Sequence, residues 1–232
     1  MPFSGGSFGL YIAVMVLTLI IGGGAQAYVS SQLKDKSRIQ SSWGVTGVDM
    51  ARRMAHDKGI GAIPVYQGGP NQDHFDPRNN SVTLGTETFG QTSLTAVATA
   101  VHEVGHACQY AEGYWFMSVR SAFAPIASLA SNGWIIVFFM GIFFGAASAL
   151  GAFFIKLGIV MFAAVLLFHL ITLPVEFDAS RRGLAYLRDC GMNQGELAAC
   201  SQVLRACALT YVAAALTALI QFLYMLLSVR DN

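Results

Sequence analysis

Two histidines and a glutamate at helical spacing carry the clearest chemical signal in the sequence. Residues 102–106 read His-Glu-Val-Gly-His, and residues four apart on an α-helix project from one face, one turn apart. His102 and His106 can therefore bind a single Zn²⁺ ion through their imidazole nitrogens. Glu103 can then take a proton from a water that the metal activates. The spacing predicts a metal-binding helix that carries its own general base.

A third protein ligand is needed, because catalytic zinc sites use three protein ligands and leave a further position open. The sequence offers five candidates: Glu176, Asp178, His169, His74 and Glu87. Glu176 is favoured, because an apolar hairpin between residues 106 and 174 would return the chain to the side it left. Asp178 could instead orient a ligating histidine. His169 is expected inside an apolar span, His74 in a loop and Glu87 in solvent, and all three stay open as alternatives.

The composition is that of a membrane protein. Of the 232 residues, 54% are hydrophobic and 12% are charged, whereas a soluble domain has about 25% charged residues. The net charge of +1 gives no reason to expect a nucleic-acid partner. The fold class we expect is a mainly α integral membrane protein with about four transmembrane helices, so the lipid bilayer is an expected partner.

Apolar and polar stretches divide the chain into six segments. We expect transmembrane helices over residues 8–29, 123–145, 151–173 and 210–229. Between them we expect a polar segment over residues 30–120, which carries the metal helix at 93–111. We also expect a helical segment over residues 174–208, which carries the third ligand.

Smaller elements follow from local pattern. Apolar positions in residues 47–59 predict an amphipathic helix, and residues 67–80 read as a turn-rich loop. Residues 81–84 read as a strand, which at a sheet edge could pair with an extended peptide. Pro64 would confine a strand over residues 63–66 to an edge, and Pro174 is expected to begin a new helix.

The charges near the first span predict its orientation. Lys34, Lys36 and Arg38 follow it at once, and basic residues close to a span favour the cytoplasmic side. We therefore expect a multi-pass protein of the cell membrane with its active site on the cytoplasmic side. Ala25-Gln-Ala27 resembles a signal-peptidase site, so removal of the first span is the alternative. Because residues 1–7 contain no basic residue, a retained span is favoured.

Three motifs in this order resemble the YugP-type membrane zinc metallopeptidases. They are His102-Glu-Val-Gly-His106, Asp73-His-Phe-Asp-Pro-Arg78 and Pro174-Val-Glu-Phe-Asp-Ala-Ser-Arg-Arg182, and the likeness runs from about residue 28 to the last span. The resemblance implies a small zincin-like α/β segment and one Zn²⁺ per chain on His102, His106 and Glu176. Glu103 would be the catalytic glutamate. HtpX-type proteases are more distantly similar, but they carry Asp where this chain has Ser180.

The function implied is hydrolysis of peptide bonds in peptides or proteins, including membrane proteins under quality control. His74, Arg78 and Arg181 are candidates for contact with the substrate or the oxyanion. The main alternative is a catalytically silent membrane scaffold with a structural zinc site, which an intact Glu103 disfavours. Few charges in the spans disfavour a transporter, and the polar residues 71–93 favour cleavage at the membrane surface over cleavage within it.

Overall fold

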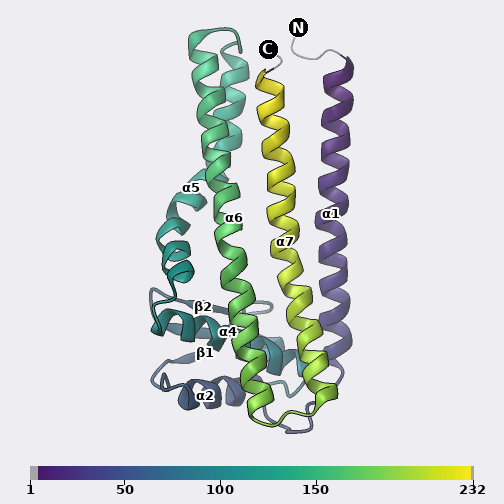
Figure 1. Ribbon diagram of the computed structural model, residues 1–232, viewed down its shortest axis with the longest axis vertical. Helices are drawn as coiled ribbons and strands as arrows, with labels where there is room; N and C mark the ends of the chain where they lie inside the picture. Colours follow the sequence, from purple (N-terminus) through teal and green to yellow (C-terminus); the bar gives the residue numbers. More distant parts are fainter. Residues whose placement is uncertain (1–4, 231–232) are drawn as a thin grey trace. The chain divides into compact units, whose positions relative to one another are not determined.

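The computed structural model describes residues 5–230, and these are mainly helical, with one small sheet (Figure 1). By length and composition, four helices among them can cross a membrane. They are α1 (Gly5–Ser37), α5 (Trp115–Phe143), α6 (Ala149–Asp189) and α7 (Gln194–Arg230). The predicted fold class, a mainly α membrane protein with about four spanning helices, is confirmed.

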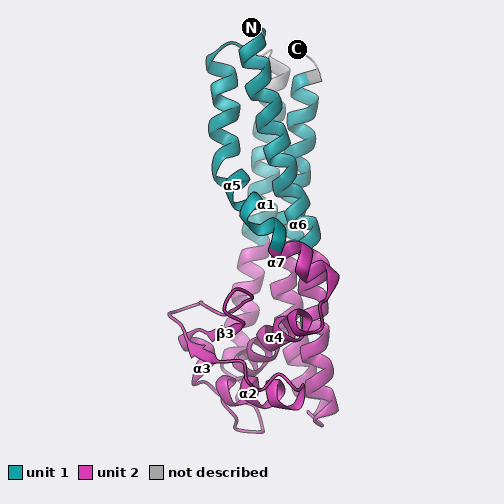
Figure 2. Ribbon diagram, turned by 90° about the vertical axis from the view of Figure 1, so that its left-hand side faces the viewer, with its two compact units in different colours: residues 1–24, 122–172, 211–232 teal, residues 25–121, 173–210 magenta. Residues whose placement is uncertain are grey.

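The chain divides into two compact units (Figure 2). The first unit holds the described residues up to 24, residues 122–172, and those from 211 onward. The second unit holds residues 25–121 and 173–210, so the four long helices contribute residues to both. His102, Glu103, His106 and Glu176 all belong to the second unit.

Glycines allow α5 and α6 to form a close hairpin in the first unit. A Cβ added at Gly158 would lie 3.0 Å from Phe138 Cβ, and one at Gly141 would lie 2.8 Å from the backbone nitrogen of Ile155. Small residues permit such approach between helices in a bilayer, where the hydrophobic effect drives no association between them. The Trp134 and Phe162 rings add an edge-to-face contact at 4.7 Å between centroids.

The long helices continue past the predicted span boundaries. Pro174 was expected to begin a new helix, and this is wrong, because α6 runs unbroken from Ala149 to Asp189 with Pro174 inside it. An interior proline removes one hydrogen bond, and helices in apolar bundles tolerate this because neighbouring groups compensate. The span expected at 151–173 and the first part of the segment expected at 174–208 therefore form one helix, and α7 likewise joins residues 194–208 to the last span.

In the second unit, capped helices surround a shared core. Helix α2 (Gly47–Asp57) begins at Thr46, whose side chain accepts a hydrogen bond from the Asp49 amide, and its apolar face is buried. Helix α4 (Leu94–Ala111) carries the metal motif and is capped by Ser93 in the same way. A short helix, α3 (Thr86–Phe89), precedes it. Because α4 is buried on nearly every side, the motif histidines lie in the core rather than on a solvated face.

The sheet corrects two predictions. Its strands are β1 (Val65–Gln67), β2 (His74–Asp76) and β3 (Ser81–Leu84), in the order β1-β3-β2. The peptide-pairing edge predicted at residues 81–84 is wrong, because β3 is the central strand, parallel to β1 and antiparallel to β2. The segment read as a loop contains β2, whose Phe75 is buried. The free edges belong to β1 and β2.

Helices α4 and α6 pack against each other almost backbone to backbone. A Cβ added at Gly105 would lie 2.6 Å from the Ala179 carbonyl oxygen, and one at Gly183 would lie 2.9 Å from Val101 Cγ2. One turn further, the Gln109 side chain donates a hydrogen bond to the Val175 carbonyl. These contacts advance by four residues on α4 as they go back by four on α6, so the two helices are antiparallel where they meet.

We predict that Gly105→Ala destabilises the second unit. The new methyl group would strike a backbone oxygen that cannot rotate away, and overpacking of this kind costs about 1–3 kcal/mol. The thermal unfolding midpoint in detergent should fall by several degrees, and zinc content should fall with it. Gly90→Ala is the control, because a Cβ at Gly90 meets nothing within 4 Å. Equal midpoints for the two variants would contradict this packing.

Candidate metal centre

Three side chains from α4 and α6 converge at one point. The Nε2 atom of His102 lies 3.3 Å from Glu176 Oε2, and that of His106 lies 3.6 Å from the same oxygen. One ligand atom from each of the three residues lies within 4.8 Å of the others. His106 and Glu176 are buried, and the His102 side chain is 12% exposed. The third-ligand candidate favoured from the sequence is the carboxylate that the fold brings to the histidines.

A fixed amide sets the tautomer of His106. The Gln109 side-chain nitrogen donates to the Val175 carbonyl and to Asp178 Oδ2, at 2.8 and 2.9 Å. The Gln109 oxygen is therefore the atom that faces His106 Nδ1, at 3.0 Å. An amide oxygen can only accept, so His106 carries a proton on Nδ1, and Nε2 is the ring nitrogen that faces Glu176.

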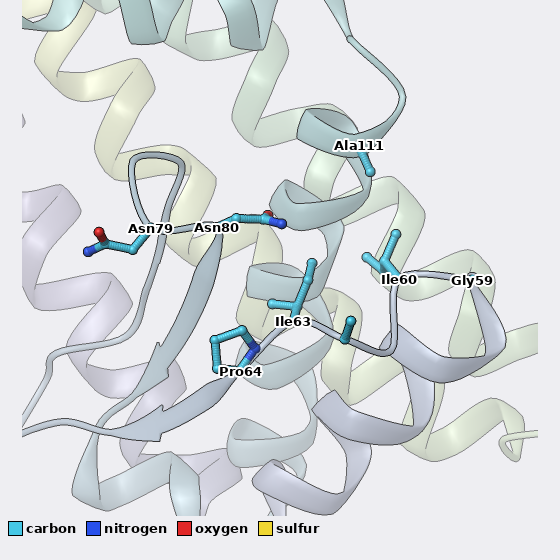
Figure 3. A pocket seen from close by; sticks show the side chains of 8 residues that line it. Gly59, Ile60, Ile63, Pro64, Asn79, Asn80 and Ala111 are labelled. Carbon is cyan, nitrogen blue, oxygen red and sulfur yellow. The ribbon is translucent and has the colours of Figure 1, made fainter.

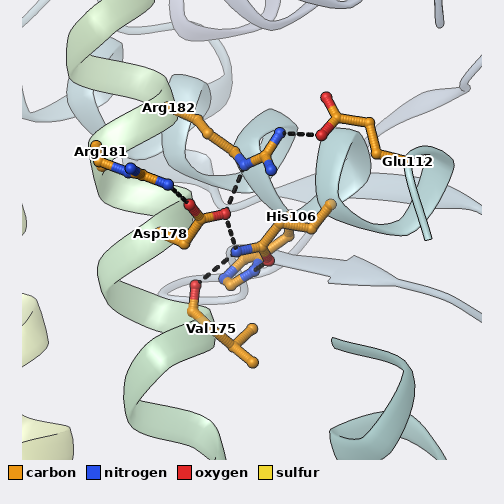
Figure 4. A network of polar contacts seen from close by, with 7 residues as sticks. His106, Glu112, Val175, Asp178, Arg181 and Arg182 are labelled. Atoms are coloured by element: carbon orange, nitrogen blue, oxygen red, sulfur yellow. Dashed lines mark hydrogen bonds and ion pairs between the residues drawn. The ribbon is translucent and has the colours of Figure 1, made fainter. Parts of the chain in front are cut away.

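Arginines hold the outer end of this network. Arg181 and Arg182 both pair with Asp178, and Arg182 also reaches Glu112 at the end of α4 (Figure 4). Asp178 was predicted to orient a ligating histidine through its second nitrogen. The structure places it one step further out, because Gln109 stands between Asp178 and His106.

His102 has a hydroxyl partner instead. Its Nδ1 atom lies 3.1 Å from Ser180 Oγ, and Ser180 follows Glu176 by one turn of α6. If His102 donates from Nδ1, its Nε2 is free to bind a metal, as in His106. Ser180 is thus a neutral hydroxyl partner for His102.

The geometry and the donor atoms fit a zinc ion. Tetrahedral bonds of about 2.0–2.1 Å place ligand atoms about 3.4 Å apart, close to the 3.3 and 3.6 Å found between the imidazoles and Glu176. Two histidines and one glutamate are a standard donor set for catalytic zinc. Glu176 Oε1 is buried and has no hydrogen-bond partner among residues 5–230, so hydrogen bonds leave this carboxylate incompletely satisfied.

Glu103 lies beside the cluster and is 7% exposed. Burial raises the pKa of its carboxyl from 4.5 to about 7; the imidazole of His102 opposes the rise, and the carboxylates of Glu176 and Asp73 add to it. A carboxyl that titrates near neutrality can both accept and return a proton at physiological pH. This is the property that a general base and acid needs.

The other candidates lie away from the cluster. Arg78 is exposed and pairs with Asp76 at 3.0 Å in the turn after β2. Arg181 is 78% exposed and pairs with Asp178. His74 is exposed on β2, opposite Thr83. None of the contacts found for these three reaches His102, Glu103, His106 or Glu176, so a role in binding substrate stays a prediction.

The contacts that three residues make with the cluster were not predicted from the sequence. Gln109 and Ser180 could have been found, because they follow His106 by three residues and Glu176 by four, on the same helical faces. Arg120, whose Nη2 atom lies 3.4 Å from Glu176 Oε1, carries no such signal, since α5 brings it in from outside the motifs.

A separate cavity of about 350 Å³ lies elsewhere in the second unit (Figure 3). Its lining includes Ile60, Ile63, Pro64, Asn79 and Asn80, and no ionisable side chain contributes to it. It shares no residue with the cluster on α4 and α6, so it is not part of the metal centre.

Comparison with known proteins places the chain in a family. The sequence profile of the family described as "Putative neutral zinc metallopeptidase" matches residues 11–230. The chain belongs to this family. A relative, the "Putative membrane protease YugP" of Bacillus subtilis (strain 168), is 36% identical over 228 residues. That match covers 96% of this chain and 99% of the relative, and it confirms the predicted resemblance. No solved structure matches the chain.

We predict that Glu103→Gln stabilises the metal-free protein, and does so more strongly as pH rises. The folded carboxyl has a pKa of about 7 and the unfolded one about 4.5, so between these values the folded state binds more protons. Unfolding free energy therefore falls as pH rises through this window, by up to about 3 kcal/mol. In chelator, thermal midpoints of wild type and Glu103→Gln should coincide near pH 4.5 and separate by pH 8.

Glu87→Gln is the matched control for this titration. Glu87 is exposed, and a hydrogen bond from the Asn71 amide lowers the pKa of its carboxyl. The ionised Glu87 carboxylate stabilises the folded state above pH 4.5, and this contribution is lost as pH falls. Glu87→Gln should therefore not gain stability at pH 8. A Glu103→Gln midpoint that stays parallel to wild type from pH 4.5 to 8 would contradict a buried carboxyl with a raised pKa.

Proposed function

We propose that this chain is a membrane-bound zinc metalloendopeptidase. The observation that carries the proposal is the convergence of two imidazole nitrogens on one carboxylate oxygen, 3.3 and 3.6 Å away, with Glu103 buried beside them. His102, His106 and Glu176 would hold one Zn²⁺ per chain. When bound, the ion supplies Lewis acidity, which activates water and polarises the scissile carbonyl. The family and the relative named as a membrane protease support this assignment.

The protein side chains perform the proton transfers. Glu103, ionised, accepts a proton from the attacking water and then delivers it to the amine that leaves. In the metal-free protein, burial raises the pKa of its carboxyl to about 7, so Glu103 holds a proton more readily than an exposed glutamate does. Ser180 and Gln109 hold the rings of His102 and His106 in place during this cycle, because each contacts the Nδ1 atom that faces away from Glu176. A base is of no use to a purely structural metal site, so Glu103 favours the enzyme over the silent scaffold.

The substrates we propose are peptide segments of membrane proteins, including misfolded ones under quality control. The support is that four helices of this chain can span a bilayer, which confines the protein to the surface where such substrates occur.

We predict that Glu103→Gln abolishes cleavage while zinc remains bound. Loss of the base should lower the rate of cleavage about 10²–10⁴-fold. Zinc should stay bound, because the three ligands are untouched. The measurement compares the two proteins, zinc-loaded in detergent, on a mixed peptide library, and then in vesicles that also contain an unfolded membrane protein. Glu87→Gln should cleave like wild type. Equal cleavage by wild type and Glu103→Gln would contradict the role of the base, and zinc-bound wild type that cleaves nothing would favour the scaffold.

We also propose that residues after the first span face the cytoplasm, because Lys34 and Lys36 end α1. An alkaline phosphatase reporter, active only outside the cytoplasm, is expected to be inactive when fused at residue 34. Since four spans return the chain to the starting side, a fusion at the C-terminus should be active. An active fusion at residue 34 would place the site on the other side of the membrane.

A further inference from the structure

We propose that Arg120 is a positioning residue for the metal ligand Glu176, an inference that rests on the proposed function. Its guanidinium lies against Oε1 of Glu176, so that Oε2 is the one oxygen that the carboxylate offers to the metal. Arg120 lies near the start of α5, within the second unit. Its Nη2 atom lies 3.4 Å from Oε1, while the two imidazoles lie against Oε2. The two oxygens of Glu176 therefore face different partners.

The Arg120–Glu176 ion pair matters for stability because the Glu176 carboxylate is buried. The Glu176 side chain is 3% exposed, and the Arg120 side chain is 28% exposed. A buried carboxylate is strongly destabilising when its charge has no partner. Oε1 has no hydrogen bond within the described chain, so the guanidinium beside it is the compensation found there.

The other arginines near the site have different partners. Arg181 and Arg182 are engaged by Asp178, on the outer side of the Gln109 network. Arg78 is engaged by Asp76 in the turn after β2. Among the ion pairs of residues 5–230, Arg120 thus contributes the one guanidinium that faces a proposed ligand.

The chemical consequence concerns the number of metal bonds. A carboxylate can bind a metal through one oxygen or through both, and catalytic zinc needs an open position for water and substrate. A cation held at Oε1 competes with the metal for that oxygen. Arg120 should therefore keep Glu176 bound through one oxygen and the metal four-coordinate, with its open position available.

The test uses cobalt, which reports coordination number without any substrate. The full-length chain in detergent is loaded with Co²⁺, and visible absorption per cobalt and affinity by chelator competition are measured. Wild type should give the intense bands of a tetrahedral site. Arg120→Met should weaken the bands severalfold and lower metal affinity about 10–100-fold, as loss of an outer partner typically does. Arg120→Lys, which keeps a positive charge, should recover part of both.

Two further variants complete the test. Arg188→Met removes an arginine that pairs with Asp189 on the surface, and it should match wild type in spectrum and affinity. Arg120→Gln keeps polar bulk without charge, and it replaces Arg120→Met if that variant does not fold. A wild-type spectrum and affinity in the folded, charge-free variant would overturn the inference.

The outcomes also separate this inference from the proposed function. Wild type that binds cobalt tetrahedrally but cleaves no peptide would contradict the peptidase and leave the role of Arg120 standing. Wild type that cleaves peptide, with an unchanged spectrum in Arg120→Met, would overturn the role of Arg120 and leave the peptidase standing.

Discussion

The close antiparallel contact of α4 and α6 is the constraint on which the metal centre depends. Gly105 lies between the two motif histidines in sequence, and it is the position where the α4 backbone meets the Ala179 carbonyl. Neighbouring contacts between the same helices set His102 beside Ser180 and His106 beside Glu176. A larger residue at the contact would separate the helices and move the third ligand away from the histidines. The distance between backbones therefore decides whether three side chains form one site.

Charge balance is the second requirement of this buried site. Glu103 and Glu176 are both carboxyls in the core, and burial alone disfavours two negative charges there. The two carboxyls are accommodated in different ways. Glu103 has a raised pKa, whereas Glu176 lies against two imidazoles and a guanidinium. A bound divalent cation would complete this balance, which is the electrostatic argument for a metal at this point.

Much of this arrangement could be predicted from the sequence, because it depends on local periodicity. The spacing within residues 102–106 defines one face of a helix, and the apolar stretches have the length of a bilayer crossing. Pairing of strands is not local. The place of residues 81–84 in the centre of the sheet, and the strand at residues 74–76, depend on partners distant in sequence. The continuity of α6 through Pro174 likewise depends on tertiary packing that overrides a local preference.

The central claim is that two imidazoles and Glu176 bind one zinc ion, and X-ray absorption at the zinc edge tests it most directly. The protein purified in detergent should hold about one zinc per chain, and the account predicts nitrogen and oxygen neighbours at about 2.0–2.1 Å. Scattering from the outer ring atoms should correspond to two imidazoles, and Glu176→Gln should change the first shell while keeping both rings. Sulfur at about 2.3 Å would place the metal on the cysteines and contradict the account, as would a chain that binds no zinc.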